Sequence, residues 1–449
     1  MKRTIFSLAI ILLGGLPILA QESKTTGLSL QQCVQMAVEK NINAKTARID
    51  KEKSRYKTEE TRSILLPKVN VSGSFQDNIS LPTTLIPGSF VGKPGTDIAM
   101  QMGSQYSTAA SLNISQVLYN KTALLALEIS KKAASLSELS VEKANEEIAA
   151  EVARLYFLAL TTTEQQKLIE GNIARTEKLK NITKVTVDNG IGKQVDLDRV
   201  SVNLENYYTQ LSNTQATLEQ QLNMMKYMLD IPQEQTITLT DKTDMLLLKS
   251  TPMLMSDFSN HIDIKLLESQ QEINLLNQKS IKSGYLPTLN FSGLLAYQGL
   301  KSDFKDYFSA DSKWYPYSYF TVNLSVPVFD GFEKRAKSRQ AKLDYQKTQE
   351  KLDATKQSFS MSFKNAMNNY QNNKNNVDRQ QQNLKLAEKV YDETSLKYRE
   401  GLAGMTNLLQ DEISLSNAQA GYLTALYNFK DAEVKIMSLN GEIRNLINN

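Results

Sequence analysis

The sequence predicts a mixed α and β chain that is mostly helical, with four β-strands and several very long helices. Three observations predict this class. No proline occurs between Pro94 and Pro232 or after Pro327, and long stretches without proline permit long helices. Four segments alternate apolar and polar residues with a period of two, which indicates strands. The two halves of the chain also resemble each other, so the same order of elements is expected twice.

The composition argues against an enzyme and against a nucleic-acid-binding protein. The 449 residues include 52 basic and 48 acidic residues, and this balance gives no electrostatic attraction for nucleic acid. A single cysteine, Cys33, excludes an intrachain disulfide and a cysteine-rich zinc site, and a single histidine, His261, excludes a histidine metal cluster. We therefore expect no catalytic residue, no cofactor and no metal. His261 lies at a predicted helix start, where a capping or surface role is expected.

Residues 1–20 are expected to form a secretory signal peptide. A basic start is followed by a mostly apolar run over 5–19, and the small residue Ala20 precedes the expected cleavage position. The alternative is an N-terminal membrane anchor, although the apolar run is short for a span. No later window of 18 residues is apolar throughout. The mature chain is therefore expected to be exported without a membrane-spanning helix, either soluble or as a β-barrel protein.

An internal duplication organises the mature chain. A shift of 220 residues aligns 41–75 with 261–295, and shifts of 210 and 211 align two later blocks. The change in offset gives the first copy a loop about ten residues longer after Phe75. Chance similarity is the alternative to a true repeat. The predicted division is a signal peptide 1–20 and one protomer 21–449, with repeats near 28–231 and 255–441 and a linking segment 232–260.

The four predicted strands have one apolar face and one face of small polar residues. They lie within 69–75, 106–114, 289–297 and 320–328, and Asn and Ser fill most alternate positions. This pattern is typical of a barrel wall that faces lipid on one side and water on the other. The alternative is a sandwich face that packs on a soluble core. Four strands cannot close a barrel, so several chains would have to share a single barrel. Two, three or four chains would give a barrel of eight, twelve or sixteen strands.

The predicted helices form one long and two shorter pieces in each repeat. The long helix 332–400 spans about 100 Å at 1.5 Å per residue. The shorter helices 261–285 and 405–440 together nearly match that length when they are placed end to end. The first repeat has the equivalent pieces 41–65, 121–189 and 193–230, and the linking segment contains a possible short strand at 236–240.

The Asn- and Gln-rich segment 365–383 can be read in two ways. Apolar residues recur every seven positions through it, from Phe363 and Tyr370 to Tyr391 and Tyr398. We interpret it as a helix with one narrow apolar stripe and a broad polar face suited to lining water. Low-complexity disorder is the alternative.

Four short motifs occur in a fixed order within the duplication. They are Leu28–Ala37 followed by Asn41, the pairs Leu66-Pro67 and Leu286-Pro287, the segment Pro327–Gly331, and the turns Asn189-Gly190-Ile191 and Glu400-Gly401-Leu402. Each motif is weak alone. Together they resemble the TolC family of outer-membrane efflux proteins over essentially the whole mature chain.

The resemblance implies a homotrimer whose chains share a 12-strand outer-membrane β-barrel, continuous with a long periplasmic α-helical coiled-coil barrel. The implied function is the exit duct of a tripartite efflux pump or type I secretion system, with passive export gated at the periplasmic helical tip. The implied partners are a periplasmic adaptor (membrane fusion) protein, an inner-membrane transporter and outer-membrane lipid. The linking segment would join an equatorial belt. Drug, protein and metal cargo all remain open.

The resemblance also assigns two groups of residues near the helical turns. The adaptor-contact candidates are Gly190, Ile191, Gly192, Gly401, Leu402, Ala403 and Gly404. The alternative is that the glycines only permit tight left-handed turns. The gate candidates are Asp196, Tyr398, Asn407, Gln410 and Asp411. The family's partner arginine is replaced here by Ala403, and its aspartate ring falls on the uncharged Asn407 and Gln410. Asp411 and Glu412 could substitute for that ring, although solvated charges are the expected reading.

Two other functions compete with the channel. An exported coiled-coil structural or adhesive protein without a pore would explain the helical stripes, but it would not explain the paired strands with Asn and Ser faces. An enzyme would need a nucleophile motif, and none is evident among the plentiful Ser, Asp and Glu residues.

Overall fold

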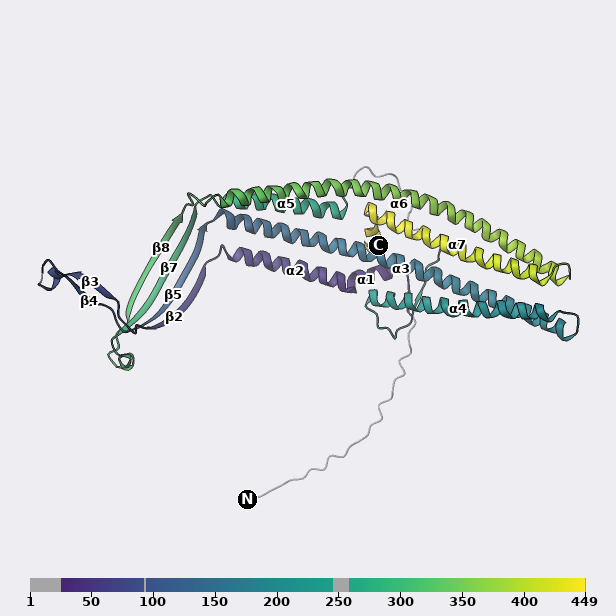
Figure 1. The fold of residues 1–449 in the computed structure, drawn as a ribbon, viewed down its shortest axis with the longest axis horizontal. Helices are drawn as coiled ribbons and strands as arrows, with labels where there is room; N and C mark the ends of the chain where they lie inside the picture. The colour runs from purple at the N-terminus through teal and green to yellow at the C-terminus, as the bar shows by residue number, and fades with distance from the viewer. Residues whose placement is uncertain (1–25, 93, 245–257, 449) are drawn as a thin grey trace, which may run out of the picture.

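A computed structural model describes residues 26–92, 94–244 and 258–448 of the chain (Figure 1). The molecule is elongated, with a four-stranded sheet toward one end and long helices that run side by side away from it. The predicted signal peptide 1–20 lies outside the described residues, as does the part of the linking segment from 245 to 257.

The first half of the chain contains the longest helix. Asn120 begins this helix, because its side chain accepts a hydrogen bond from the backbone N–H of Ala123. The elements, in order, are β1 Thr26–Leu28, α1 Leu30–Lys40, α2 Ile42–Ser63, β2 Lys68–Asp77, β3 Thr83–Pro87, η1 Gly88–Val91, β4 Asp97–Gln101, β5 Tyr106–Tyr119, α3 Lys121–Asp188, α4 Gln194–Leu229 and β6 Ile237–Leu239.

The second half repeats the order of the main helices and strands. Its long helix begins after Asp330, whose carboxylate accepts hydrogen bonds from the backbone N–H groups of Phe332 and Lys334 at 3.1 Å. The elements, in order, are α5 Ile262–Ser283, β7 Thr288–Lys301, η2 Phe304–Phe308, β8 Tyr315–Ser325, α6 Glu333–Arg399, α7 Met405–Asn440, η3 Glu442–Arg444 and α8 Asn445–Asn448.

The predicted helical arrangement is confirmed. The shorter helices α5 and α7 both pack along α6, and α2 and α4 pack along α3 in the same way (Figure 1). The Asn- and Gln-rich segment lies within α6, so the alternative of disorder is wrong. Phe363 and Tyr370 are buried there, which is why one narrow apolar stripe is sufficient to hold this polar segment in a helix.

The register of the sheet places the predicted apolar residues on one face. The strand order is β2-β5-β7-β8, with antiparallel neighbours. Val71 lies opposite Leu112, and Leu112 lies opposite Leu295. The other face is polar, and Ser72 and Ser111 are hydrogen-bonded across it at 2.8 Å. Both edges of this sheet lack a partner strand among the described residues.

Two details of the strands differ from the sequence prediction. The last strand, β8, ends at Ser325, so Val326 and Val328 do not extend it. Pro327 between them has no backbone N–H for a further ladder bond. The longer loop of the first repeat also contains an unpredicted antiparallel hairpin of β3 and β4, which projects beyond the sheet.

At the centre of the molecule, the first described strand, β1, pairs with a strand from the middle of the chain. The predicted short strand is present as β6, and it pairs in parallel with β1, which the sequence did not predict. The buried Tyr156 of α3 donates a hydrogen bond to the carbonyl oxygen of Leu28 at 3.0 Å. A core of α1, α3, α6 and α7 side chains surrounds this point. Within the described ranges, no helix combines the length and apolar character that a membrane crossing requires.

Candidate functional site

The two helical turns farthest from the sheet have the same backbone structure. The N–H of Gly190 donates to the carbonyl of Val187 at 2.8 Å, and the N–H of Ile191 donates to that of Thr186 at 2.9 Å. This pair of bonds is a Schellman motif with glycine in the left-handed conformation, here at φ +73°. The turn after α6 repeats both bonds, with Gly401 at φ +75°. The left-handed backbone conformation therefore explains why glycine occupies both positions.

Both turns present an apolar side chain to solvent. Ile191 is 83% exposed and Leu402 is 75% exposed. Gly192 differs from its equivalent Ala403, because an added Cβ would lie only 2.8 Å from Thr186 Oγ1 and 2.9 Å from the backbone N of Val187. Gly404 has an ordinary φ of −84° and open space around its Cβ position. The seven predicted tip residues thus occupy two adjacent turns.

Asp196 belongs to a polar link between the two helical hairpins. Its carboxylate accepts a hydrogen bond from Arg199 at 3.3 Å, and the same guanidinium donates to Thr406 Oγ1 at 3.0 Å. Arg199 comes from α4 and Thr406 from α7. The sequence reasoning looked for an arginine at Ala403 and missed Arg199, although the Asp-x-x-Arg spacing places the two side chains on one helix face.

The other predicted gate residues are distributed along the same end of the molecule. Tyr398 packs against a small apolar cluster of Val200, Met405 and Leu409. The remaining three candidates lie on α7: Asn407 and Gln410 are exposed, and Asp411 is half-buried. No side-chain hydrogen bond or ion pair in the described part of the chain joins these three to Asp196.

Glu412 is the buried charge of this region, and the expectation of a solvated group is wrong. It is 1% exposed and accepts hydrogen bonds from Thr176 of α3 at 2.6 Å and Asn203 of α4 at 3.2 Å. Burial raises its pKa, whereas these hydrogen bonds and the nearby Arg175 act in the opposite direction. Glu412 therefore binds three helices together. Glu412 continues the helical spacing of the buried residues Met405, Leu408 and Leu415, and this spacing could have predicted its burial.

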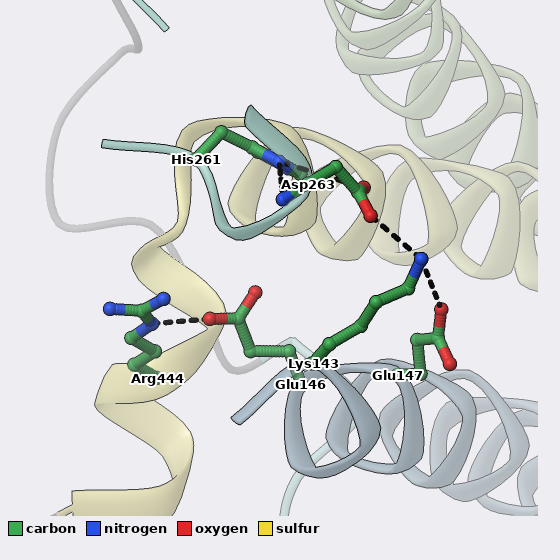
Figure 2. Close-up of polar contacts among 6 residues, drawn as sticks. All are labelled: Lys143, Glu146, Glu147, His261, Asp263 and Arg444. Atoms are coloured by element: carbon green, nitrogen blue, oxygen red, sulfur yellow. Dashed lines mark hydrogen bonds and ion pairs between the residues drawn. The ribbon is translucent and has the colours of Figure 1, made fainter. Parts of the chain in front are cut away.

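A second polar cluster lies at the middle of the molecule, where α5 begins beside α3 (Figure 2). Lys143 donates to Asp263 at 2.7 Å and lies 3.7 Å from Glu147. Arg444, close to the end of the chain, forms an ion pair with Glu146. These contacts fasten the start of the second repeat and the C-terminal segment to α3.

His261 is confirmed as a capping residue, and its side chain is only 8% exposed. Its Nδ1 accepts the backbone N–H of Asp263 at 3.2 Å, as Asn41 does for the N–H of Asn43 at the start of α2. Its ring lies 4.1 Å from that of Phe359. Burial lowers its pKa. Asp263, Glu146 and a hydrogen bond with the backbone of Ser438 oppose that shift, and Arg444 adds to it.

We expect acid to weaken the fold through this histidine. The folded pKa lies below the ordinary value of 6.5, so stability is complete above that value and is lost as the pH falls below it. The loss is at most about 1.4 kcal/mol per pH unit for one group. Thermal unfolding at about pH 7.5 and about pH 5.5 should show it. The matched variant His261→Asn has the capping residue of the first repeat and should remove part of the dependence. If the variant keeps the full pH dependence of stability, the dependence comes from carboxylates and not from His261.

No group of three or more His, Cys, Asp or Glu side chains suited to a metal ion occurs in residues 26–92, 94–244 and 258–448. The buried acids are instead satisfied by hydroxyl, amide and basic groups. The arrangement suits a mechanical role, in which polar links hold long helices together.

The sequence model of the family described as outer membrane efflux protein matches residues 33–229 and 262–442. The outer membrane protein TolC of Salmonella enteritidis is 22% identical, and the match covers 92% of this chain and 84% of that protein. The TolC of Escherichia coli strain K12 is 20% identical over 96% of this chain and 85% of that protein.

Solved structures of outer-membrane channels have the same fold. The CmeC outer membrane channel of Campylobacter jejuni has a TM-score of 0.72 at 17% identity, with 98% of this chain and 94% of that chain covered. The MtrE outer membrane channel of Neisseria gonorrhoeae, solved in its open state, has a TM-score of 0.71 at 18% identity, with 92% and 88% covered.

Proposed function

Because this chain belongs to the outer membrane efflux protein family, we propose that three copies share one 12-strand barrel in the outer membrane and continue it as a helical duct in the periplasm. The family places the protein in the outer membrane as an efflux channel, and its relatives are channel proteins and not enzymes. The alternative of a coiled-coil structural protein without a pore is not favoured.

The observation that carries the shared barrel is the register of the sheet. One face is apolar and exposed, the other is polar, and both edges have unpaired backbone groups in the described structure. An open sheet edge cannot lie in lipid, where no water satisfies its N–H and C=O groups. Three sets of four strands close the sheet as twelve, with the apolar face toward lipid and the polar face toward the lumen.

The duct would meet its partners at the two exposed turns. Gly190, Ile191, Gly192 and Gly401 to Gly404 are the proposed contacts for a periplasmic adaptor, which joins the channel to an inner-membrane transporter. Ile191 and Leu402 support this proposal, because an apolar side chain exposed at both turns is suited to burial by a partner. The transporter supplies the energy, and the channel is a passive exit.

The gate would consist of polar links between the hairpins α3–α4 and α6–α7. The Asp196–Arg199–Thr406 link and Tyr398 hold the hairpins near the turns, with Asn407, Gln410 and Asp411 farther along α7. Adaptor binding would favour a separated arrangement, which is a two-state change. A signal peptide 1–20, repeats near 28–231 and 255–441 and a linking segment 232–260 remain part of this proposal. The repeated order of helices and strands supports the two repeats.

Single cysteines can test which face lines water. The native Cys33 is completely buried and its pKa is raised to about 12, so it is unreactive. In planar bilayers, a membrane-impermeant thiol reagent should reduce the conductance of Ser111→Cys and leave its neighbour Leu112→Cys unchanged. Native mass spectrometry of the detergent-extracted protein should give a trimer. A monomer without conductance would contradict the proposed channel.

Removing the charge of Asp196 should raise the conductance of the resting channel severalfold. Asp196 orients Arg199 toward Thr406, so Asp196→Asn weakens the link between the hairpins. Asp198→Asn is the matched control, because that carboxylate accepts its hydrogen bond from Gln194 of its own helix. Single-channel recording in planar bilayers measures both. Equal conductance of the two variants would remove Asp196 from the gate.

A further inference from the structure

Three tyrosines lie on the polar face of the sheet, at alternate positions of the edge strand β8. Tyr315, Tyr317 and Tyr319 lie opposite Gln298, Ala296 and Leu294 of β7. Their partners belong to the same face as Ser111 and Asn113 of β5. The three residues therefore form a tyrosine stripe in the half of the sheet that is farther from the helices.

The three tyrosines stand opposite uncharged residues of β7. Ala296 is only 3% exposed, whereas the three tyrosines are 52%, 44% and 57% exposed. The described residues show no hydrogen bond from the three phenol hydroxyls to another group of the chain. Among the strand positions of the polar face, Lys68 at the helix end is the one charged residue. Here the strand positions of the polar face offer aromatic surface and hydroxyls without a charged side chain among them.

We propose that the tyrosine stripe is a contact site for planar aromatic cargo as it leaves through the outer half of the channel. This inference rests on the proposed channel, because it requires the polar face to line the lumen. An exposed tyrosine offers a rigid ring for stacking and a hydroxyl for hydrogen bonding. Stacking on an aromatic side chain tolerates many ring systems, which suits an exit path with varied cargo.

The lack of charged residues at these strand positions favours aromatic molecules over metal cations as the cargo that the stripe contacts. A metal cation prefers carboxylate, imidazole or thiolate ligands, and the strand positions of the polar face present none of these. Three tyrosines instead occupy alternate positions of one strand. A weak, repeated contact of this kind allows a molecule to bind and still leave.

The test uses the intact trimer in planar bilayers and two cationic probes. Proflavine is planar and aromatic, and tetraethylammonium has the same charge without a ring. We expect proflavine to produce resolvable current blocks and tetraethylammonium to produce none. Replacing all three tyrosines by leucine should shorten the proflavine blocks by about tenfold or more, as expected for lost stacking. The triple phenylalanine variant should retain blocks within about twofold of the original, since it keeps the rings.

A control on the opposite face of β8 shows whether the blocks arise at the stripe. Phe320→Leu alters the same strand on its apolar face and should leave the blocks unchanged. Unchanged blocks in the triple leucine variant would overturn the site. A triple leucine variant with a less stable trimer and unchanged blocks would assign the stripe to the contact between chains. A protein that forms no pore would contradict the proposed channel itself, whereas a normal pore without proflavine blocks would contradict this inference alone.

Discussion

Replacing Lys430 by methionine should destabilise the folded protein by about 3–5 kcal/mol, the usual cost of removing one partner from a buried ion pair. Lys430 and Glu433 of α7 are each 1% exposed at the side chain, and their charged atoms lie 3.0 Å apart. Burial lowers the pKa of Lys430, and Glu433 opposes that shift. The variant leaves the buried Glu433 carboxylate without this ammonium group. Denaturant or thermal unfolding in detergent measures the loss.

Two further variants show whether the effect belongs to the pair. Lys430→Met combined with Glu433→Leu removes both charges and should recover most of the stability, because well-packed apolar residues can replace a buried ion pair. Lys435→Met changes an exposed lysine of the same helix and should shift stability by no more than about 0.5 kcal/mol. Similar losses for Lys430 and Lys435 would show that the buried pair has no special role.

Replacing Gly401 by valine should abolish most export while the trimer still assembles. The left-handed φ of +75° is strained for any residue with a Cβ, by about 1–2 kcal/mol, and more for a β-branched one. Open space surrounds the position, so the effect comes from the backbone and not from a clash. The turn must rearrange, which moves Leu402 away from the proposed adaptor contact. Export by cells that also contain the adaptor and transporter measures the loss.

Two controls separate the position of the substitution from the backbone strain that it introduces. Gly401→Asn is tolerated better, because asparagine adopts the left-handed conformation more readily. Gly441→Val introduces the same strain at φ +76° at the opposite end of α7, far from the turn. It should reduce stability but leave export per assembled trimer nearly normal. Equal export defects for Gly401→Val and Gly441→Val would point to general destabilisation.

Most of the architecture was predictable because its signals are local. Proline positions and glycine turns bound the long helices, and alternation defines the strands. The same alternation places Val71 and Leu112 on one face, since each strand has a period of two. Asn120 and Asp330, whose side-chain oxygens cap two helix starts in the structure, are local signals that the sequence prediction did not use. The repeat then transfers each inference from one half of the chain to the other.

The features that sequence reasoning missed depend on distant residues. Glu412 looks like a surface charge until Thr176 and Asn203 of two other helices surround it. The pairing of β1 with β6 joins residues 211 positions apart, such as Thr26 and Ile237, and no local pattern encodes such a contact. The hairpin of β3 and β4 was hidden by prolines and glycines, which are depleted in strands.

That hairpin has a consequence for the symmetry of the proposed trimer. The long helices of the two halves, α3 and α6, end in turns with the same hydrogen bonds, so a partner that approaches the periplasmic end of a trimer would meet six nearly equivalent sites. The hairpin is present in the first half of the chain, and the corresponding loop of the second half carries the short helix η2 instead. An approach from outside the cell would therefore meet threefold symmetry. Three copies of one duplicated chain would thus present a pseudo-sixfold surface to periplasmic partners and a threefold surface to the exterior.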